Sequence, residues 1–322
     1  MDRPDAVTRL RTAVGAFAAA HGGRRWCVAL SGGADSLALT AVAATVRPTV
    51  ALIVDHGLQP DSAEIAGAAH RQAMDLGCVA AQVITVDVGT EGGPEAAART
   101  ARYRALDEAR AGLPVLLGHT LDDQAETVLL GLGRGSGARS IAGMRDYDAP
   151  WGRPLLAVRR AVTRAACAEL GLRPWEDPHN TDPRFTRVRL RTEVLPLLEE
   201  VLGGGVADAL ARTAAALRED SEALDALAAR TLAEARRGDG LDVTALSGLP
   251  AAVRRRVIRR WLLDGGARDL TSAQIHRVDA LVTGWHGQGG VAVTSAPRRG
   301  ARPARLFAAR RDGMLTMYTE PV

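Results

Sequence analysis

Residues 31–36 read Ser-Gly-Gly-Ala-Asp-Ser and directly follow the apolar run Trp-Cys-Val-Ala-Leu at 26–30. Paired glycines let a chain turn tightly with its backbone N–H groups facing a concavity, and the start of a following helix adds partial positive charge. The sequence therefore predicts a phosphate-binding loop. The alternative is a plain strand-to-helix turn in which Asp35 or Ser36 caps the helix.

A second chemical cluster lies at 118–126, which reads Gly-His-Thr-Leu-Asp-Asp-Gln-Ala-Glu. On a helix that begins near residue 122, Asp122 and Glu126 are four residues apart, and Asp123 and Glu126 are three apart. Both spacings bring carboxylates to one side of a helix, where they could bind an amine. The alternative is a capping box with Asp123 as the N-cap and Glu126 at the third helical position.

The elements that position these residues follow from an alternation of apolar runs and helical patterns. Strands are predicted at 26–30, 50–56, 80–88 and 114–120, and helices near 35–46, 61–76, 94–111 and 122–132. This order predicts an α/β fold with a mostly parallel, Rossmann-like sheet covered by helices on both faces. Ligands of such sheets lie beyond the carboxyl ends of the strands, where the loop, Asp55-His56 and Gly118-His119 all fall.

The second half of the chain changes character. A connecting segment at 133–185 contains one predicted helix near 160–171, and helical patterns continue to about 237 with a break at the glycines of 203–205. A basic amphipathic helix at 253–263 and strands at 290–297 and 305–318 follow. We therefore expect a boundary near residue 205, with one domain at 1–205 and a smaller α+β domain at 206–322.

Composition excludes several kinds of chemistry. The 322-residue chain has 41 basic residues, all arginine, so a Walker A lysine, a pyridoxal Schiff base and a lysine nucleophile are excluded. The three cysteines are far apart and predict neither a disulfide framework nor a zinc or iron–sulfur site. The apolar stretches are short and interrupted by charges, so we expect no membrane span and a cytoplasmic protein. A net charge of +4 is compatible with a nucleic-acid partner.

Several motifs together resemble a known family. The loop at 31–36 resembles the pyrophosphate loop (PP-loop) of the N-type ATP pyrophosphatases, which bind ATP without a Walker lysine. Within that superfamily, other segments resemble in order and spacing the tRNA(Ile)-lysidine synthetases: VDHGLQPDSAEIA, AARTARYRALDEA, GHTLDDQAETVLLGLGRGSGARSIAGM, RPLL and WEDPHNTDPRFTRVRLRTEVLPLLE. The resemblance covers about residues 26–200. It departs at Arg187-Val188, where the family usually has Arg-Asn.

The resemblance implies a reaction. ATP, with Mg²⁺, activates cytidine 34 in the CAU anticodon of tRNA(Ile): the C2 oxygen attacks the α-phosphate and pyrophosphate leaves. The ε-amine of free L-lysine then attacks C2 and expels AMP, which leaves lysidine. Because the lysine amine has a reference pKa near 10.4, its deprotonation at pH 7.4 costs about 4 kcal/mol, so a neighbouring base is expected.

The resemblance also assigns roles to residues of this chain. The ATP-binding set comprises Ser31, Gly32, Gly33, Ala34, Asp35 and Ser36, with Asp55 and His56 on the adenosine side. Asp35 is the expected Mg²⁺ ligand. The catalytic set adds His119, Asp122, Asp123 and Glu126, among which the base is to be found. The tRNA-binding set comprises Arg134, Arg139, Arg153, Arg187, Arg189 and Arg191.

Two other functions, the role of one basic segment and the oligomeric state stay open. A PP-loop tRNA thiolation enzyme would use the same ATP chemistry, and a non-catalytic module could bind ATP as a sensor. The basic run at 254–260 is either a solvated helix face or a grip on the tRNA body. The sequence does not determine the oligomeric state and leaves a homodimer open.

Overall fold

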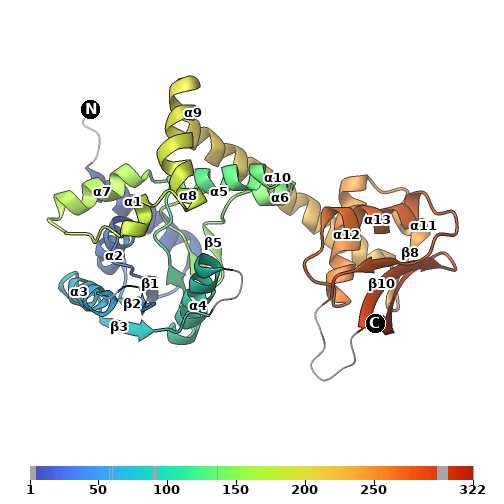
Figure 1. Cartoon of the computed structure of the whole chain (residues 1–322), viewed down its shortest axis with the longest axis horizontal. Coiled ribbons are helices and arrows are strands. Elements are labelled where there is room, and N and C mark those ends of the chain that lie inside the picture. The colour runs from blue at the N-terminus through green and yellow to red at the C-terminus, as the bar shows by residue number, and fades with distance from the viewer. Residues whose placement is uncertain are drawn as a thin grey trace. The chain divides into compact units, whose positions relative to one another are not determined.

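The computed structural model describes residues 5–57, 59, 61–89, 93–135, 137–295 and 304–321. The chain divides into two compact units, Met1–Ala215 and Ala216–Val322 (Figure 1). The division falls inside helix α10 (Val206–Ala235), whereas the sequence predicts it near residue 205, at the glycines that precede this helix. Among the described residues, no helix has the length and apolar character that crossing a membrane requires.

The first unit is built on a mostly parallel sheet, as predicted. Its strand order is β3-β2-β1-β4-β6-β5, and only β5 runs antiparallel to its neighbour. The strands are β1 (Trp26–Ala29), β2 (Thr49–Asp55), β3 (Ala80–Thr85), β4 (Val115–Leu116), β5 (Tyr147–Asp148) and β6 (Trp151–Gly152). The strands β2 and β3 lie on one side of β1, and β4, β6 and β5 lie on the other. The strand order therefore reverses at β1, and ligands of such sheets bind beside the loop at this point.

Helices cover this sheet on both faces. They are α1 (Ala6–His21), α2 (Ala34–Val46), α3 (Ser62–Asp75), α4 (Pro94–Ala109), α5 (Leu121–Gly133), α6 (Ala138–Ile141) and α7 (Arg160–Glu169). Two short helices, α8 (Thr186–Arg189) and α9 (Leu195–Val201), flank a π-helical turn at Leu190–Val194. The predicted βαβ alternation is therefore confirmed.

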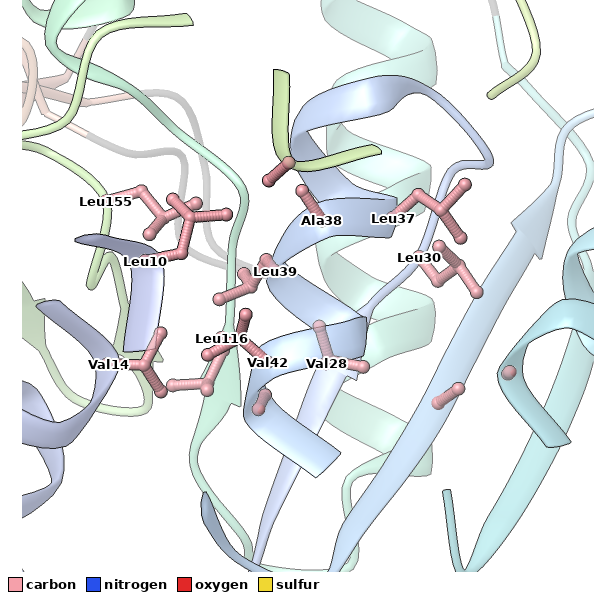
Figure 2. Packing of buried hydrophobic residues seen from close by; sticks show 14 of the residues in the cluster. Leu10, Val14, Val28, Leu30, Leu37, Ala38, Leu39, Val42, Leu116 and Leu155 are labelled. Atoms are coloured by element: carbon pink, nitrogen blue, oxygen red, sulfur yellow. The ribbon is translucent and has the colours of Figure 1, made fainter. Parts of the chain in front are cut away.

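The strand β1 is apolar at every position because it has helices above and below it. Val28 and Leu30 point into a core shared with α1 and α2, which Figure 2 shows from close by. Cys27 and Ala29 point to the opposite face, where they pack near Leu106 of α4. The side chains of β1 therefore alternate between two buried faces of the sheet. Packing on both faces fixes the end of this strand, and with it the start of the loop that follows.

The second unit is a smaller α+β domain, also as predicted. Its antiparallel sheet has the order β7-β8-β11-β10-β9, and α12 and α13 lie over one side of it (Figure 1). The elements are β7 (Arg236–Arg237), β8 (Gly240–Asp242), α11 (Val243–Ser247), α12 (Ala251–Asp264), α13 (Ser272–Thr283), β9 (Val291–Val293), β10 (Ala304–Arg311) and β11 (Met314–Pro321). Of the strand predicted at 290–297, residues 296 and 297 lie outside the described residues.

The basic run at 254–260 lies on α12, where most of its charges are paired. Arg254 is buried and donates to the Asp279 carboxylate at 2.6 Å, and Arg255 donates to the same carboxylate at 2.9 Å. Arg256 donates to Asp225 at 2.9 Å. These arginines hold the helices of the second unit together, so the run is not a simple solvated face.

Candidate active site

The loop between β1 and α2 has the geometry of a phosphate-binding loop. Gly32 has a φ of +85°, and Gly33 is the N-cap of α2. Asp35 and Ser36 lie inside the first helical turn, so the alternative in which either one caps the helix is wrong. The Ser36 hydroxyl donates to the Gly33 carbonyl oxygen at 3.0 Å and accepts the Ser31 N–H at 3.2 Å, which closes the loop on itself.

The start of α2 is open to a ligand. No side chain of the described residues caps this helix, so its first backbone N–H groups have no side-chain acceptor. Uncapped N–H groups together with the helix dipole favour an anion at this position. The loop can therefore hold phosphate without a lysine, as the sequence predicts.

Gly118, which follows β4, brings the second chemical cluster against this loop. A Cβ atom at this position would lie 2.9 Å from the Ser36 nitrogen and 3.0 Å from the Asp35 carbonyl carbon. Only a residue without a side chain allows so close an approach of the two backbones. The carboxylates of α5 are consequently brought next to the start of α2.

A cavity of about 240 Å³ opens beside the loop at the carboxyl ends of β1 and β2. Its walls include Ser31, Asp55 and His56, and most of the remaining lining is apolar. The segment around Trp175 closes one side, since the Trp175 N–H donates to the Gly32 carbonyl oxygen at 3.0 Å. An apolar pocket with few polar groups is the usual form of a small-molecule site.

One guanidinium group joins the acidic residues of the site. Arg160, the first residue of α7, donates to Asp35 Oδ2 at 3.1 Å, to Asp123 Oδ1 at 2.6 Å and to Glu126 Oε1 at 3.3 Å. Its backbone N–H donates to Asp122 Oδ2 at 2.7 Å. The structure thus brings together the four carboxylates of the predicted catalytic set, around a residue that the sequence does not single out.

Further arginines complete this carboxylate cluster, which consists of Asp35, Asp122, Asp123 and Glu126. The Glu126 side chain is 0% exposed and also pairs with Arg191 at 2.8 Å and with Arg187 at 3.6 Å. Arg159 pairs with Asp122 at 3.2 Å. Every carboxylate of the cluster therefore has a guanidinium partner.

The helix cap near this cluster differs from the predicted alternative. Thr120 is the N-cap of α5, and Asp123 Oδ2 accepts the Thr120 N–H at 2.8 Å and the Thr120 hydroxyl at 2.7 Å. The capping box with Asp123 as the N-cap and Glu126 as its partner is therefore wrong. The helix begins at Leu121, one residue earlier than expected, and Asp123 at the third helical position closes the capping box onto the Thr120 backbone. Asp123 uses one oxygen for the cap and the other for Arg160.

Burial sets the protonation of the groups around the cluster. It raises the pKa of Asp35, although Arg160 and a hydrogen bond from Thr163 act in the opposite direction. Burial would also raise the pKa of Asp123, but Arg160 and the Thr120 hydrogen bonds hold that pKa below its usual value. Burial lowers the pKa of His119 to about 4, so this imidazole is neutral at pH 7 and a weak base.

The six predicted tRNA-binding arginines have different surroundings. Arg187 and Arg191 contact the carboxylate cluster. Arg153 is buried, and its Nη1 donates to the Arg145 carbonyl oxygen at 3.0 Å. Arg189 pairs with Glu193 at 2.8 Å within its own helical stretch, while Arg134 and Arg139 are exposed at the end of α5 and in α6. Of the six, Arg187 and Arg191 thus lie at the cluster itself.

Val188 replaces the family's usual asparagine without leaving a polar vacancy. Its side chain is buried, with 7% of its surface exposed. An apolar side chain in that position is satisfied by packing and requires no hydrogen-bond partner.

Arg159, Arg160 and Trp175 are the main site residues that the sequence reasoning missed. A usable signal was present for the arginines. Arg159 is the N-cap of α7 and Arg160 its first residue, and the first turn of this helix contains no acidic residue. Positive charge at a helix N-terminus is unfavourable unless anions lie close by. Two arginines at this position therefore indicate acidic partners elsewhere in the fold.

The residues present fit a magnesium ion that arrives with phosphates. Among the described residues, no group of three or more His, Cys, Asp or Glu side chains could hold a metal ion. Asp35 stands beside the loop as a single carboxylate, engaged by Arg160 and Thr163. Because Mg²⁺ commonly binds through one or two carboxylates, phosphate oxygens and water, a shared site fits and an all-protein site does not.

The cysteines are not reactive groups. Cys27, Cys78 and Cys167 are all buried, and burial raises the pKa of each thiol to about 11. A thiol with so high a pKa is protonated at neutral pH and is a poor nucleophile.

Comparisons with known proteins agree with this geometry. Residues 6–198 match the family described as "PP-loop domain", and residues 241–311 match the "TilS substrate binding domain". The tRNA(Ile)-lysidine synthase of Mycolicibacterium paratuberculosis is 71% identical over 100% of both chains. The enzyme of the same name from Mycobacterium tuberculosis is 66% identical over 100% of both chains. The one from Rhodococcus erythropolis is 62% identical over 98% of this chain and 96% of its own length.

Among solved structures, the U34-tRNA thiolase NcsA from Methanococcus maripaludis has a similar fold. It is 18% identical, with a TM-score of 0.53 over 66% of this chain and 80% of its own. At that identity the likeness concerns the fold alone. The full-length relatives and the two matching domains are specific, and on their evidence the chain belongs to the tRNA(Ile)-lysidine synthase family.

Proposed function

We propose that this protein ligates L-lysine to C2 of cytidine 34 in the CAU anticodon of tRNA(Ile), using ATP, and so forms lysidine in the cytoplasm. The observation that carries the proposal is the junction of two sites at Asp35 and Arg160. A phosphate-binding loop lies on one side of this junction and a carboxylate cluster on the other. An enzyme that activates one substrate with ATP and then joins it to an amine requires a phosphate-binding site and an amine-binding site next to each other.

In the first step, the loop would bind the pyrophosphate end of ATP and the cavity its adenosine. Ser31, Gly32, Gly33, Ala34 and Ser36 would supply the cradle, and Asp55 and His56 would face the nucleoside. Mg²⁺ held by Asp35 would neutralise phosphate charge when bound. The C2 oxygen of cytidine attacks the α-phosphorus, and the bond to the pyrophosphate oxygen breaks.

In the second step, the lysine amine would enter beside Asp123 and Glu126. Because Arg160, Arg187 and Arg191 already pair with these carboxylates, the pocket holds little uncompensated negative charge. Neighbouring guanidinium groups disfavour a second cation, so they lower the pKa of the bound amine and assist its deprotonation. The free amine attacks C2, and the C2–oxygen bond breaks to release AMP.

The departing proton would go to a group at the cluster. His119 is neutral but weakly basic, since burial lowers its pKa to about 4. Burial raises the pKa of Asp35, whereas it lowers that of His119. We therefore assign proton transfer to the carboxylates, with His119 as a hydrogen-bonding group.

The tRNA would meet both units of the chain. Arg187 and Arg191 border the carboxylate cluster and suit an inserted nucleotide, because a guanidinium group pairs with phosphate and stacks on bases. Exposed Arg134 and Arg139 could contact the tRNA backbone. Buried Arg153 could not do so directly. The second unit would bind the tRNA outside the anticodon, and a homodimer is not required by this scheme.

The rival functions are less well supported. Thiolation usually relies on paired reactive cysteines or a cluster, whereas the thiols here are buried and protonated. An ATP sensor would have no use for a carboxylate cluster beside the phosphate loop.

Exchange of labelled pyrophosphate into ATP tests the proposal. If the base is activated, exchange requires tRNA(Ile) with cytidine 34 and proceeds without lysine. A tRNA with uridine at that position should suppress exchange, because unpaired buried groups cost about 1 to 3 kcal/mol. Added lysine should then release AMP and yield a base heavier by one lysyl residue. Exchange driven by lysine without tRNA, or a modified base that contains sulfur, would exclude the proposal.

A further inference from the structure

Asp122 differs from its neighbours in the carboxylate cluster in what it contacts. Its Oδ2 atom accepts the backbone N–H of Arg160 at 2.7 Å, and its Oδ1 atom pairs with the Arg159 guanidinium at 3.2 Å. Asp123 and Glu126, by contrast, contact the guanidinium group of Arg160. Both oxygens of Asp122 are therefore used at the start of α7, whereas Asp123 and Glu126 face the cation at the centre of the cluster.

The contact between Asp122 and the Arg160 N–H fixes the backbone from which the central guanidinium extends. Arg160 is the first residue of α7, and the side chain of the N-cap, Arg159, makes no capping hydrogen bond. The first N–H groups of a helix have no partner within the helix, so a carboxylate from elsewhere satisfies one of them and offsets the positive end of the dipole. Asp122 thus links α5 to the start of α7.

Arg159 continues these contacts to α10. Its Nη1 atom lies 3.2 Å from Oδ2 of Asp208, in the first turn of that helix, and 3.8 Å from Oε1 of Glu199. Glu199 accepts the N–H groups of Val206 at 3.0 Å and Ala207 at 3.2 Å, so it caps the same helix. These backbone hydrogen bonds lower the pKa of Glu199, which keeps its charge beside Arg159.

Apolar packing joins the same helices. Leu121 and Ala125 of α5, Leu195 of α9 and Ala207 of α10 form one buried cluster. The start of α10 and the helix that carries the carboxylates therefore belong to one packed assembly. The same α10 continues beyond Ala215 into the second unit.

We propose that Asp122 and Arg159 are positioning residues for the amine pocket: Asp122 holds the backbone of Arg160, and Arg159 fastens Asp122 to the start of α10. This inference rests on the proposed function, in which lysine enters beside Asp123 and Glu126. Asp122 acts on lysine through Arg160 and does not itself bind the ammonium group. The start of α10 in turn affects how well the enzyme uses lysine.

The two steps of the full-length enzyme separate this role from a general loss of structure. Pyrophosphate exchange with tRNA(Ile) reports the first step, and kcat/KM for lysine at saturating ATP and tRNA reports the second. Asp122→Ala leaves the Arg160 N–H without its acceptor, so kcat/KM for lysine should fall about 10- to 100-fold. Exchange should fall much less, because Arg160 reaches the phosphate loop only through Asp35. Asp122→Asn keeps an acceptor oxygen and should recover most of the loss.

The link to α10 is tested separately. Arg159→Met keeps the aliphatic stem and removes the charge, so kcat/KM for lysine should fall about 2- to 5-fold, the effect of partly exposed ion pairs. Arg159→Lys should restore part of it. Asp208→Asn should have a similar effect in the wild type and none in Arg159→Met, because the Asp208 carboxylate pairs with Arg159. The controls are Arg164→Met and Asp220→Asn, at exposed positions of α7 and α10, which should keep the wild-type value.

The contrary results are distinct from one another. Equal losses in Asp122→Ala and Asp122→Asn would show that the Asp122 charge binds the lysine amine directly, and would overturn the inference. A proportional loss of exchange and lysine use would also overturn it. If thermal unfolding shows that Asp122→Ala does not fold, the Arg159 variants decide, and an unchanged kcat/KM in Arg159→Met rejects the inference. A wild type that joins no lysine to tRNA would instead contradict the proposed function.

Discussion

At the residue scale, the carboxylates could be predicted from the sequence but their cation could not. Asp122, Asp123 and Glu126 lie within one helical turn, so their spacing alone places them together. Arg160 is far from them in the chain and reaches them only through the packing of α7. Sequence separation hides such a contact, and the only local sign is positive charge at the start of a helix.

Arg160→Gln should destabilise the protein by roughly 3 kcal/mol, because it leaves Asp35, Asp123 and Glu126 with less compensation in a buried place. Urea unfolding measures the change. Arg164→Gln, one turn later on α7, is the control: its side chain is 62% exposed and pairs with Glu176 at 3.6 Å, so the loss should be within about 0.5 kcal/mol. Equal stability of the two variants would show that the cluster needs no central cation.

At the element scale, the sequence predicted the strands and helices well wherever a strong pattern was present. The apolar run at 26–30 and the helix after it appear as β1 and α2 because both sheet faces are covered. The strand predicted at 114–120 shrinks to Val115–Leu116, since Gly118 leaves the sheet to approach α2. That close approach is a tertiary contact, and neither period nor propensity encodes it.

Gly118→Ala should therefore damage both stability and nucleotide binding. The new methyl group would meet the backbone at Ser36, and relieving that overlap should cost about 1 to 3 kcal/mol and shift the loop. Thermal unfolding and AMP binding should both weaken. Gly133→Ala is the control, because nothing lies within 4 Å of its added Cβ atom at the end of α5. Normal AMP affinity in Gly118→Ala would mean that the loop tolerates displacement.

At the scale of the whole molecule, the basic run that is most prominent in the sequence of the second unit is not its main exposed positive surface. The run at 254–260 is the most basic stretch, yet its arginines are largely paired with Asp279, Asp225 and Asp264. Counting charges along a sequence does not reveal such pairing. On β10, in contrast, Arg305 and Arg311 are exposed, and they alternate with core residues such as Leu306.

These two arginines flank aromatic rings on the side of the sheet opposite the core. Phe307 stacks on Tyr318 at 5.4 Å, and the Arg311 guanidinium lies 4.7 Å from the Tyr318 ring centroid. Register pairs Phe307 with Tyr318 and Arg305 with Glu320. Arginine beside aromatic rings is a common surface for RNA, so this face is the better candidate for tRNA contact in the second unit.

Replacing both Arg305 and Arg311 with glutamine should weaken binding of tRNA(Ile). It should also lower the slope of log affinity against log salt by about one unit for each tRNA phosphate that the variant no longer neutralises. AMP binding should not change, because the nucleotide cavity belongs to the first unit. The double variant Arg230→Gln, Arg277→Gln removes the same charge from exposed positions of α10 and α13. If both double variants lose affinity equally, the effect is one of net charge, and the sheet face has no special role.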